Sequence, residues 1–224
     1  MGDWSYRYVL IVRRARKIEL TKKWSDYINL HENSTFIVCG CGPSIELVKE
    51  TNTSNIILIG VNDIERHVSP KYIVSVDSMG QFSREGRIEY IVNNNCDTFF
   101  TQNDQYGKVD GRFDNTKVCK IDIVNINNAV RSDKGRFDKI FFSNNSTFVA
   151  AHIAHKMGAS KIGLIGVDFT NHNHLSTKSN LKRINNDYSR LNKEIGGKMY
   201  NLSPVSELTS IPNENIEDFI KNTK

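Results

Sequence analysis

Four short runs of the chain are apolar at consecutive positions instead of alternating with polar residues. They are TFIVCG at 35–40, NIILIGVN at 55–62, KYIVSVDS at 71–78 and SKIGLIGVDF at 160–169. A strand that is apolar on both of its faces is buried on both sides, which is typical of a parallel sheet covered by helices. We therefore expect these runs to be strands of a largely parallel sheet.

Helical patterns lie between these strands. STFVAAHIAHKMG, at 146–158, has helical periodicity and ends at Gly158, a residue typical of the position after a helix. An amphipathic helix is expected over 179–197, again with a glycine stop. Further elements are expected as a short helix at 44–50 and strands at 96–102, 117–124 and 198–204. Strands interleaved with helices predict an α/β fold with a Rossmann-like, doubly wound, mostly parallel sheet.

The length of 224 residues fits one sizeable domain, and no internal repeat or Gly/Ser-rich linker divides the chain. We expect a basic N-terminal segment at 1–34 and a single Rossmann-like domain over 35–224. If the domain carries a lid or subdomain, we expect it within residues 79–138, where the pattern is least regular.

Composition and the start of the chain indicate a soluble, cytoplasmic protein. Hydrophobic residues make up 38% and charged residues 25% of the sequence, as in ordinary globular proteins. No apolar run reaches the roughly 18 residues that a membrane span needs. The charges near the N-terminus follow the apolar stretch, the reverse of a secretory signal, and Tyr6 stands where myristoylation needs Ser or Thr.

The net charge of +5 is partly clustered in RRARK near the N-terminus. Its basic residues are Arg13, Arg14, Arg16 and Lys17. They fit either a solvated helix face or a patch that attracts phosphates, nucleic acid or an anionic surface, and charge alone does not separate the two.

The four cysteines form no C-x-x-C pattern. Cys39 and Cys41 lie two apart, so on one strand they would face the same way, and we expect both to fill the core. No disulfide is expected in a reducing compartment.

Ligands of open parallel sheets bind beyond the carboxyl ends of the strands, and the first such end here is the GCGPS stretch. Gly40 and Gly42 allow close backbone approach, and Pro43 suits the first turn of a helix. Exposed N–H groups are expected to follow and to favour a phosphate or carboxylate, with Ser44 as a further donor. The stretch is neither a Walker loop nor the dinucleotide fingerprint, because the residues that complete those motifs are missing.

Other strand ends also carry polar residues. Asn62 fits contact with a base or ribose, or a turn, and Asp77 fits a ribose hydroxyl, a metal or a turn. Asp168 ends the most apolar strand, and His172 and His174 follow in a loop, where proton transfer competes with a structural role. No third ligand for a metal is evident beside the histidines. Ser146 is expected to be the N-cap of a helix whose N-terminus would favour an anion.

The blocks IVCGCGPSIE, IGVND, YIVSVDS and STFVAAHIAHKMGASKIGLIGVDF, followed by histidine, occur in a recognisable order. Over roughly Thr35 to Pro204 the chain resembles the bacterial lipooligosaccharide sialyltransferases. It also resembles a wider family that includes Maf-type flagellin glycosyltransferases and MptE-like hydroxymethylpterin pyrophosphokinases. The resemblance implies a Rossmann-type protein that handles a nucleotide-activated substrate, with residues 35–224 as the catalytic domain.

The resemblance also implies roles for particular residues. His174 would be the general base, with His172 as the fallback and Asp168 beside them. The substrate-binding residues would be Gly40, Cys41, Gly42, Pro43, Ser44, Asn62, Asp77, Ser78, Asn145, Ser146 and Thr147. The sialyltransferases have Asn where this chain has Cys41, which leaves the donor open, and their phosphate-binding tyrosine pair has no clear counterpart here.

These features predict a glycosyltransferase that moves a sugar from a nucleotide-sugar donor to an acceptor hydroxyl. No D-x-D motif is present, so neither a metal nor another cofactor is expected. The acceptor would be a surface glycan or a hydroxylated base in modified DNA of the kind found in phage. One alternative is an MptE-like pyrophosphokinase using ATP and magnesium held by Asp77 or Asp168. The other is a non-catalytic nucleotide-binding module. The oligomeric state is left open.

Overall fold

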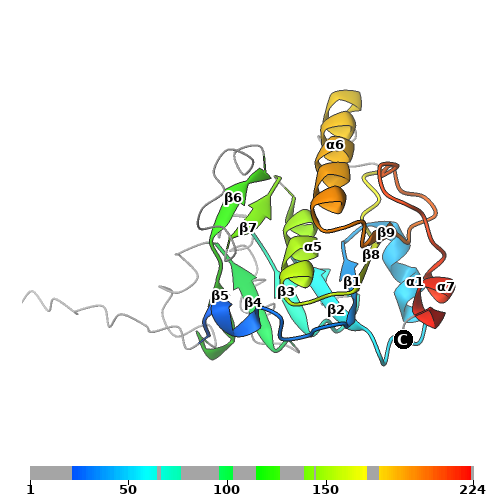
Figure 1. Cartoon of the computed structure of the whole chain (residues 1–224). Helices are drawn as coiled ribbons and strands as arrows, with labels where there is room; N and C mark the ends of the chain where they lie inside the picture. The colour runs from blue at the N-terminus through cyan, green and yellow to red at the C-terminus, as the bar shows by residue number, and fades with distance from the viewer. Residues whose placement is uncertain are drawn as a thin grey trace, which may run out of the picture.

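The computed structural model describes residues 22–64, 67–76, 96–102, 115–126, 139–143, 145–170 and 177–222. Its main sheet has seven strands in the order β5-β4-β3-β2-β1-β8-β9, and every neighbouring pair is parallel. The strands are β1 (Thr35–Cys39), β2 (Ile57–Val61), β3 (Tyr72–Val74), β4 (Thr98–Thr101), β5 (Val118–Lys120), β8 (Lys161–Ile165) and β9 (Met199–Asn201). The predicted α/β fold with a mostly parallel sheet is confirmed (Figure 1).

The strand order reverses direction at β1. Strands β2 to β5 follow one another outward on one side of β1, whereas β8 and β9 lie on its other side. A reversal of this kind opens a crevice at the carboxyl ends of the two strands that flank it, and ligands of doubly wound sheets bind there. The two flanking strands here are β1 and β8, which run directly into the GCGPS stretch and into Asp168.

Helices cover both faces of the sheet, which explains the continuous apolar runs. Phe36 and Val38 of β1 belong to the core cluster under helix α5 (Ser146–Lys156), to which α6 (Lys178–Glu194) also contributes. Ile37 and Cys39 belong to a second cluster on the opposite face, under α1 (Glu46–Lys49) and α7 (Ile216–Lys221). Successive residues of a strand point to opposite faces, so every residue of β1 must be apolar or small.

A short N-terminal element also packs onto the sheet. The 3-10 helix η1 (Trp24–Tyr27) buries both of its aromatic residues against Phe100 of β4, and the Tyr27 hydroxyl lies 2.8 Å from Thr98 Oγ1. The predicted basic cluster at Arg13, Arg14, Arg16 and Lys17 lies outside the described residues. Among the described helices, none is long and apolar enough to cross a membrane.

The prediction of one strand over 117–124 is wrong. After the 3-10 helix η5 (Asn115–Lys117), β5 ends at Lys120, and β6 (Ile123–Asn125) pairs instead with β7 (Ile140–Phe142) in a separate two-stranded parallel sheet. The chain passes from the first sheet to the second between Ile121 and Asp122. Ile121 N–H donates to Thr101 O of β4 in the seven-stranded sheet, whereas Asp122 O accepts from Ile140 N–H of β7 in the two-stranded sheet.

Four local details also differ from expectation or extend it. The N-cap of α5 is Asn145, because its Oδ1 accepts from Thr147 N–H and Phe148 N–H, and Ser146 is the first helical residue. The short helix η2 (Pro43–Ile45) precedes α1. Gly158 follows α5 with φ +100°, as predicted. The helix α7 was not expected, because six residues are too few to display a period.

The expectation that both Cys39 and Cys41 fill the core is wrong for one of them. All four cysteines are free thiols, and Cys39, Cys96 and Cys119 are buried, whereas Cys41 is exposed. The physical reason is that β1 ends at Cys39, so the strand alternation no longer applies two residues later.

Helix α5 is joined to β7 through a buried histidine. His152 Nδ1 accepts a hydrogen bond from Phe141 N–H at 2.7 Å, and the two rings stack with centroids 4.3 Å apart. Burial, reinforced by Lys156 and His155, lowers the pKa of His152 well below 6.5. Burial, reinforced by Lys198 and Lys156, lowers the pKa of His155 to about 4.

This pair predicts acid sensitivity of the fold. As the pH falls from 6.5 toward 4, the unfolded chain binds protons that the folded protein does not, so the free energy of unfolding should decrease. Each histidine contributes at most about 1.4 kcal/mol per pH unit to the dependence of the free energy of unfolding on pH. Urea unfolding between pH 7 and pH 4 measures it. His152→Asn keeps an acceptor for Phe141 N–H and should reduce the pH dependence of the free energy of unfolding by the share of one proton. An unchanged pH dependence would contradict this account.

Candidate functional site

The backbones of two loops meet in contact at the strand reversal. Beyond the ends of β1 and β8, Gly40 N–H donates to Ile165 O and Gly42 N–H to Gly166 O, each at 2.8 Å. A Cβ on Gly40 would lie 2.3 Å from Gly166 O, and Gly166 has φ +66°. Only glycine fits at both positions, so the glycines bring two backbones together as well as leaving room for a ligand.

Asp168 holds this arrangement in place. Its side chain is only 2% exposed, and Oδ2 accepts Ser44 N–H at 2.8 Å. Oδ1 accepts the hydroxyl of Ser44 at 2.7 Å and the hydroxyl of Ser203, which follows β9. Ser44 Oγ in turn accepts Gly166 N–H at 2.8 Å. One carboxylate therefore joins the Gly40–Ser44 turn to the segments that follow β8 and β9.

The exposed backbone N–H groups expected at the GCGPS stretch are not found at Gly40, Gly42 or Ser44. The N–H groups of Gly40, Gly42 and Ser44 all donate to protein acceptors. The expectation of exposed N–H groups at the GCGPS stretch is not met at these three positions, because β8 and the segment that follows it supply acceptors for them. The turn instead presents the exposed residues Cys41 and Pro43 at its surface.

The turn lies beside two other predicted strand and helix ends. Cys41 Sγ lies 3.6 Å from Val61 O, the residue before Asn62. A Cβ on Gly40 would come within 3.2 Å of Thr147 Cγ2 at the start of α5. The structure thus brings the turn, Asn62 and the N-terminus of α5 together, as the sequence predicted for one crevice.

Asn62 has an unusual environment. Its φ is +54°, in the left-handed region that asparagine tolerates better than most residues, and its N–H donates to Val74 O at 3.1 Å. Its side-chain oxygen is buried and accepts no hydrogen bond from the described residues. Buried carbonyl oxygens usually have a donor, so this oxygen is suited to accept one from a ligand.

Helix α6 holds the start of α5. Tyr188 Oη lies 2.6 Å from Thr147 Oγ1, and Asp187 accepts the hydroxyl of Ser143, on the other side of the turn. Burial raises the pKa of Tyr188, so its hydroxyl stays protonated. Two consecutive residues of α6 therefore fix the turn that presents Asn145 and Thr147.

Sequence reasoning did not find Tyr188 or Ser203. Tyr188 lies at apolar helical spacing from Ile184 and Leu191, which indicates a core residue and gives no sign of its hydroxyl bond. Ser203 lies after a short strand, in a pattern that carries no signal for a partner 35 residues away. Both contacts depend on the tertiary fold.

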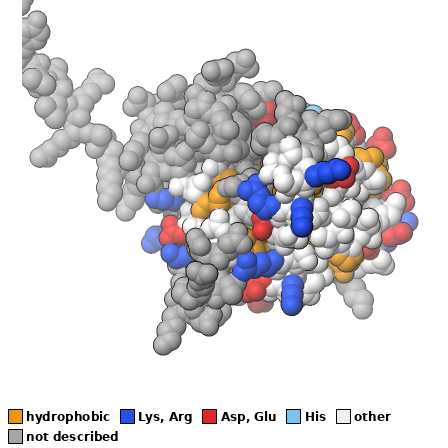
Figure 2. All heavy atoms as spheres, turned by 90° about the horizontal axis from the view of Figure 1, so that it is seen from above, with side chains coloured by type: hydrophobic (Ala, Val, Ile, Leu, Met, Phe, Trp, Pro, Cys, Tyr) orange, Lys and Arg blue, Asp and Glu red, His pale blue; other side chains and the backbone are white. Residues whose placement is uncertain are grey.

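Several predicted residues lie outside the described part of the chain: Asp77, Ser78, His172 and His174. Among the described residues, no three His, Cys, Asp or Glu side chains gather as a metal site would require. Several Lys and Arg side chains lie near the middle of the face seen from above, with Asp and Glu side chains among them (Figure 2). Among the described side chains of that face, the charge is mixed in sign.

The fold has relatives among solved structures. The MAF glycosyltransferase from Magnetospirillum magneticum AMB-1 aligns with a TM-score of 0.50 at 13% identity, over 92% of this chain and 40% of that one. This chain therefore spans about two fifths of that protein. The predicted resemblance to Maf-type proteins is confirmed at the level of the fold.

A sialyltransferase fold is also similar. The sialyltransferase CstII from Campylobacter jejuni, in complex with cytidine-5'-monophosphate, aligns with a TM-score of 0.49 at 16% identity, over 81% of this chain and 85% of that one. The same sialyltransferase with a trisaccharide acceptor and CMP aligns with a TM-score of 0.47 at 16% identity, over 80% and 85% of the two chains. No protein-family profile and no curated protein matches the sequence.

The contact between the turn and Asp168 makes a prediction for stability. A Cβ on Gly42 would lie 2.5 Å from Asp168 Oδ2, so Gly42→Ala should lower the free energy of unfolding by about 2 kcal/mol or more. Gly196→Ala is the control, since nothing lies within 4 Å of its Cβ and only its positive φ of +77° costs about 1 kcal/mol. Denaturant unfolding measures both.

A double-mutant cycle identifies the cause of that loss. The Gly42→Ala penalty should shrink but not vanish in an Asp168→Ala background, because the nearer of two clashing oxygens is then absent while Gly166 O, at 2.8 Å, remains. An equal penalty in both backgrounds would show that Asp168 does not restrict the turn.

Proposed function

We propose that this chain is a glycosyltransferase that binds a nucleotide-sugar at the carboxyl ends of β1, β2 and β8 and transfers the sugar to an acceptor hydroxyl. The observation that carries the proposal is the buried Asn62 oxygen, which lacks a donor among the described residues and follows Val61, whose backbone oxygen contacts Cys41 of the Gly40–Ser44 turn. The sequence resemblance to sialyltransferases and the fold likeness to a MAF glycosyltransferase support it.

In this proposal Asn62 accepts a hydrogen bond from an amino or hydroxyl group of the nucleotide. The exposed surface of Cys41 and Pro43 contacts the donor beside it. The N-terminus of the eleven-residue helix α5, at Asn145, Ser146 and Thr147, faces the phosphates, where its dipole stabilises negative charge.

Asp168 and Ser44 act as positioning residues in this proposal. Each is buried, and their polar atoms bond to one another and to Gly166 and Ser203. They fix the shape of the turn that supports the donor and do not touch the reacting atoms.

The reaction forms a bond from the acceptor oxygen to the anomeric carbon and breaks the bond from that carbon to the phosphate oxygen. The acceptor proton passes to His174, or to His172 as the fallback, since an imidazole titrates near neutral pH. Charge that develops on the leaving phosphate is stabilised by the α5 N-terminus, and the step requires no metal ion.

The acceptor proposed first is a glycan, as the resemblance to sialyltransferases implies. The second is a hydroxylated base in modified DNA, as in phage, contacted through Arg13, Arg14, Arg16 and Lys17. The mixed charge on the face in Figure 2 does not favour DNA over a glycan. Steep salt dependence of binding to modified DNA would favour the DNA acceptor.

The competing MptE-like pyrophosphokinase would need ATP and magnesium. The buried Asp168 carboxylate already accepts three hydrogen bonds, which leaves Asp77 as the better candidate ligand in that reading. Full loss of turnover in EDTA would select the metal-dependent reaction. Binding of nucleotide without turnover toward any acceptor would select the non-catalytic module.

The donor site can be tested with its own thiol. Among the four cysteines only Cys41 is exposed, so iodoacetamide should label the native protein there first. A nucleotide or nucleotide-sugar that raises the melting temperature in a screen should slow that labelling. Asn62→Gly keeps the positive φ but removes the carboxamide. About ten times more nucleotide should then be needed to protect Cys41 from iodoacetamide, equivalent to a loss of about 1.4 kcal/mol of binding free energy.

The matched control is Asn33→Gly, at another asparagine with positive φ (+61°), in the loop that bonds to Gly158 beyond the far end of α5. Asn33→Gly should leave the protection of Cys41 by the nucleotide unchanged. Equal affinity in Asn62→Gly and the unaltered protein would remove Asn62 from the donor site.

The general base is tested separately. His174→Ala should lower kcat by about 100-fold or more, while the nucleotide affinity stays unchanged. His172→Ala should have the smaller effect. If His174→Ala retains full turnover and His172→Ala loses it, the base is His172, and if both retain it, the assignment to this loop is wrong.

A further inference from the structure

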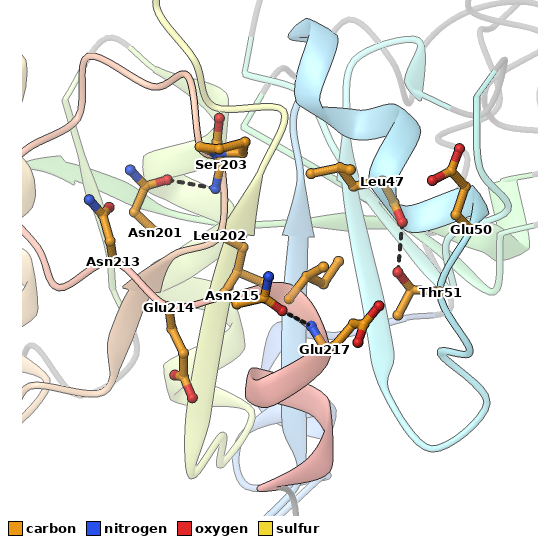
Figure 3. A pocket seen from close by; sticks show the side chains of 12 residues that line it. Leu47, Glu50, Thr51, Asn201, Leu202, Ser203, Asn213, Glu214, Asn215 and Glu217 are labelled. Carbon is orange, nitrogen blue, oxygen red and sulfur yellow. Dashed lines mark hydrogen bonds between the residues drawn. The ribbon is translucent and has the colours of Figure 1, made fainter.

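A second hollow lies on the other side of the segment that follows β9. It has a volume of about 480 Å³ and lies between α1 and the chain leading into α7 (Figure 3). Leu47, Glu50 and Thr51 come from the α1 side, and residues 201–204 and 213–217 form the opposite side. Cavities of this size hold small organic ligands.

The lining of this cavity carries acidic but no basic side chains. Glu50, Glu214 and Glu217 contribute carboxylates, and among the described residues no Lys, Arg or His side chain lines it. Two of these carboxylates are paired with amino groups outside the lining: Lys161 Nζ lies 2.9 Å from Glu214 Oε1, and Lys221 Nζ lies 3.5 Å from Glu217 Oε2. With no cation in the lining, a phosphate would find no attractive partner here, which disfavours a second donor site.

Its hydrogen-bonding groups suit a ligand with several hydroxyls. Asn215 Oδ1 accepts Glu217 N–H at 2.8 Å, and its Nδ2 donates no hydrogen bond to the described residues. Glu214 Oε2 is buried and accepts none from them. In Figure 3 the Asn215 side chain lies in the middle of the view, between the Asn201 and Ser203 side and α1. A free amide donor thus lies in the cavity, whereas the Glu214 carboxylate points away from Asn215 in Figure 3.

Apolar side chains also line the cavity. Leu47, Leu202, Pro204 and Ile216 line it, and Leu202 and Ile216 are part of the core cluster on this face of the sheet. Amide and carboxylate groups around an apolar floor match a sugar ring, whose hydroxyls radiate outward while its C–H groups form an apolar face.

The cavity shares a wall with the candidate donor site. Ser203 lines the cavity, and its hydroxyl donates to Asp168 Oδ1, the carboxylate that also holds Ser44. Only the Asp168 side chain separates Ser203, in the wall of the cavity, from Ser44 of the turn. A chain of several sugar units bound in the cavity would therefore begin close to the Gly40–Ser44 turn.

We propose that this cavity binds a neutral carbohydrate chain, as the part of a glycan acceptor that lies away from its reacting hydroxyl. The acceptor role rests on the proposed function, whereas carbohydrate binding itself does not. The cavity distinguishes the two substrates, because its lining offers polar partners to a neutral glycan but no cation to the phosphates of the donor.

The test is a titration of the full-length protein, labelled for NMR, with maltotriose and with lactose. Both neutral sugars should shift the Asn215 side-chain amide signals and the backbone signals of residues 201–204 and 213–217 in a saturable way. Asn215→Asp should weaken the affinity at least about tenfold. Its melting temperature should stay unchanged, because Asp caps a helix as well as Asn does.

Asn186→Asp is the matched control, at an exposed residue of α6 outside the cavity, and should leave the affinity unchanged. Spermidine and N-acetylneuraminic acid are the cationic and anionic probes. If either shifts the cavity signals while neutral sugars do not, or if no probe shifts them up to its solubility limit, the inference is wrong.

The same samples distinguish this inference from the proposed function. Nucleotide-induced shifts at Asn62 report on donor binding. If nucleotides cause no shifts at Asn62 but saccharides shift the cavity signals, the proposed glycosyltransferase function is wrong and the carbohydrate site remains. If nucleotides shift Asn62 but saccharides shift nothing in the cavity, the carbohydrate site is wrong.

Discussion

The carboxylate of Asp168 is the interaction on which the rest of the candidate site depends. It is buried without a cationic partner among its hydrogen bonds, and it accepts from Ser44 N–H, the Ser44 hydroxyl and the Ser203 hydroxyl. A buried charge is tolerated only when hydrogen bonds replace its hydration. Because the donors come from segments after β1 and after β9, the carboxylate ties those segments together on either side of the strand reversal.

The two proposed binding regions lie on either side of this carboxylate. On one side the Gly40–Ser44 turn lies beside Asn62 and the start of α5, which Tyr188 and Asp187 of α6 hold in position. On the other side is the cavity between α1 and α7. In our proposal the N-terminus of α5 attracts an anionic donor to the first region, whereas the lining of the second contributes carboxylates and no cation.

The sequence predicted the sheet because the cause of its apolar runs is local. Each residue of β1 faces one of two covered surfaces, so burial on both faces appears directly as TFIVC. The same reasoning failed at Ile121–Asp122, where the chain changes from one sheet to another within an unbroken apolar pattern. It also failed for Cys41, because the end of a strand depends on its neighbours and not on its own residues.

The positions of the candidate residues were easier to predict than their contacts. The polar residues at the ends of β1, β2 and β8 converge as expected from a parallel sheet. The partners of Ser44 and Asp168 could not be predicted, because hydrogen bonds between residues 124 apart leave no periodic or spacing signal. For the same reason the turn was expected to offer N–H groups that the fold in fact uses internally.

The contact of Gly40 with Gly166 has a consequence for the evolution of this fold. A Cβ at either position would lie within 2.3 Å of the other residue's carbonyl oxygen, so neither site can exchange glycine while its partner stays in place. A compensating pair of substitutions is also excluded, since both sites lack room for a methyl group. In any set of homologues these two glycines should therefore be invariant together, even where the exposed residues Cys41 and Pro43 have diverged.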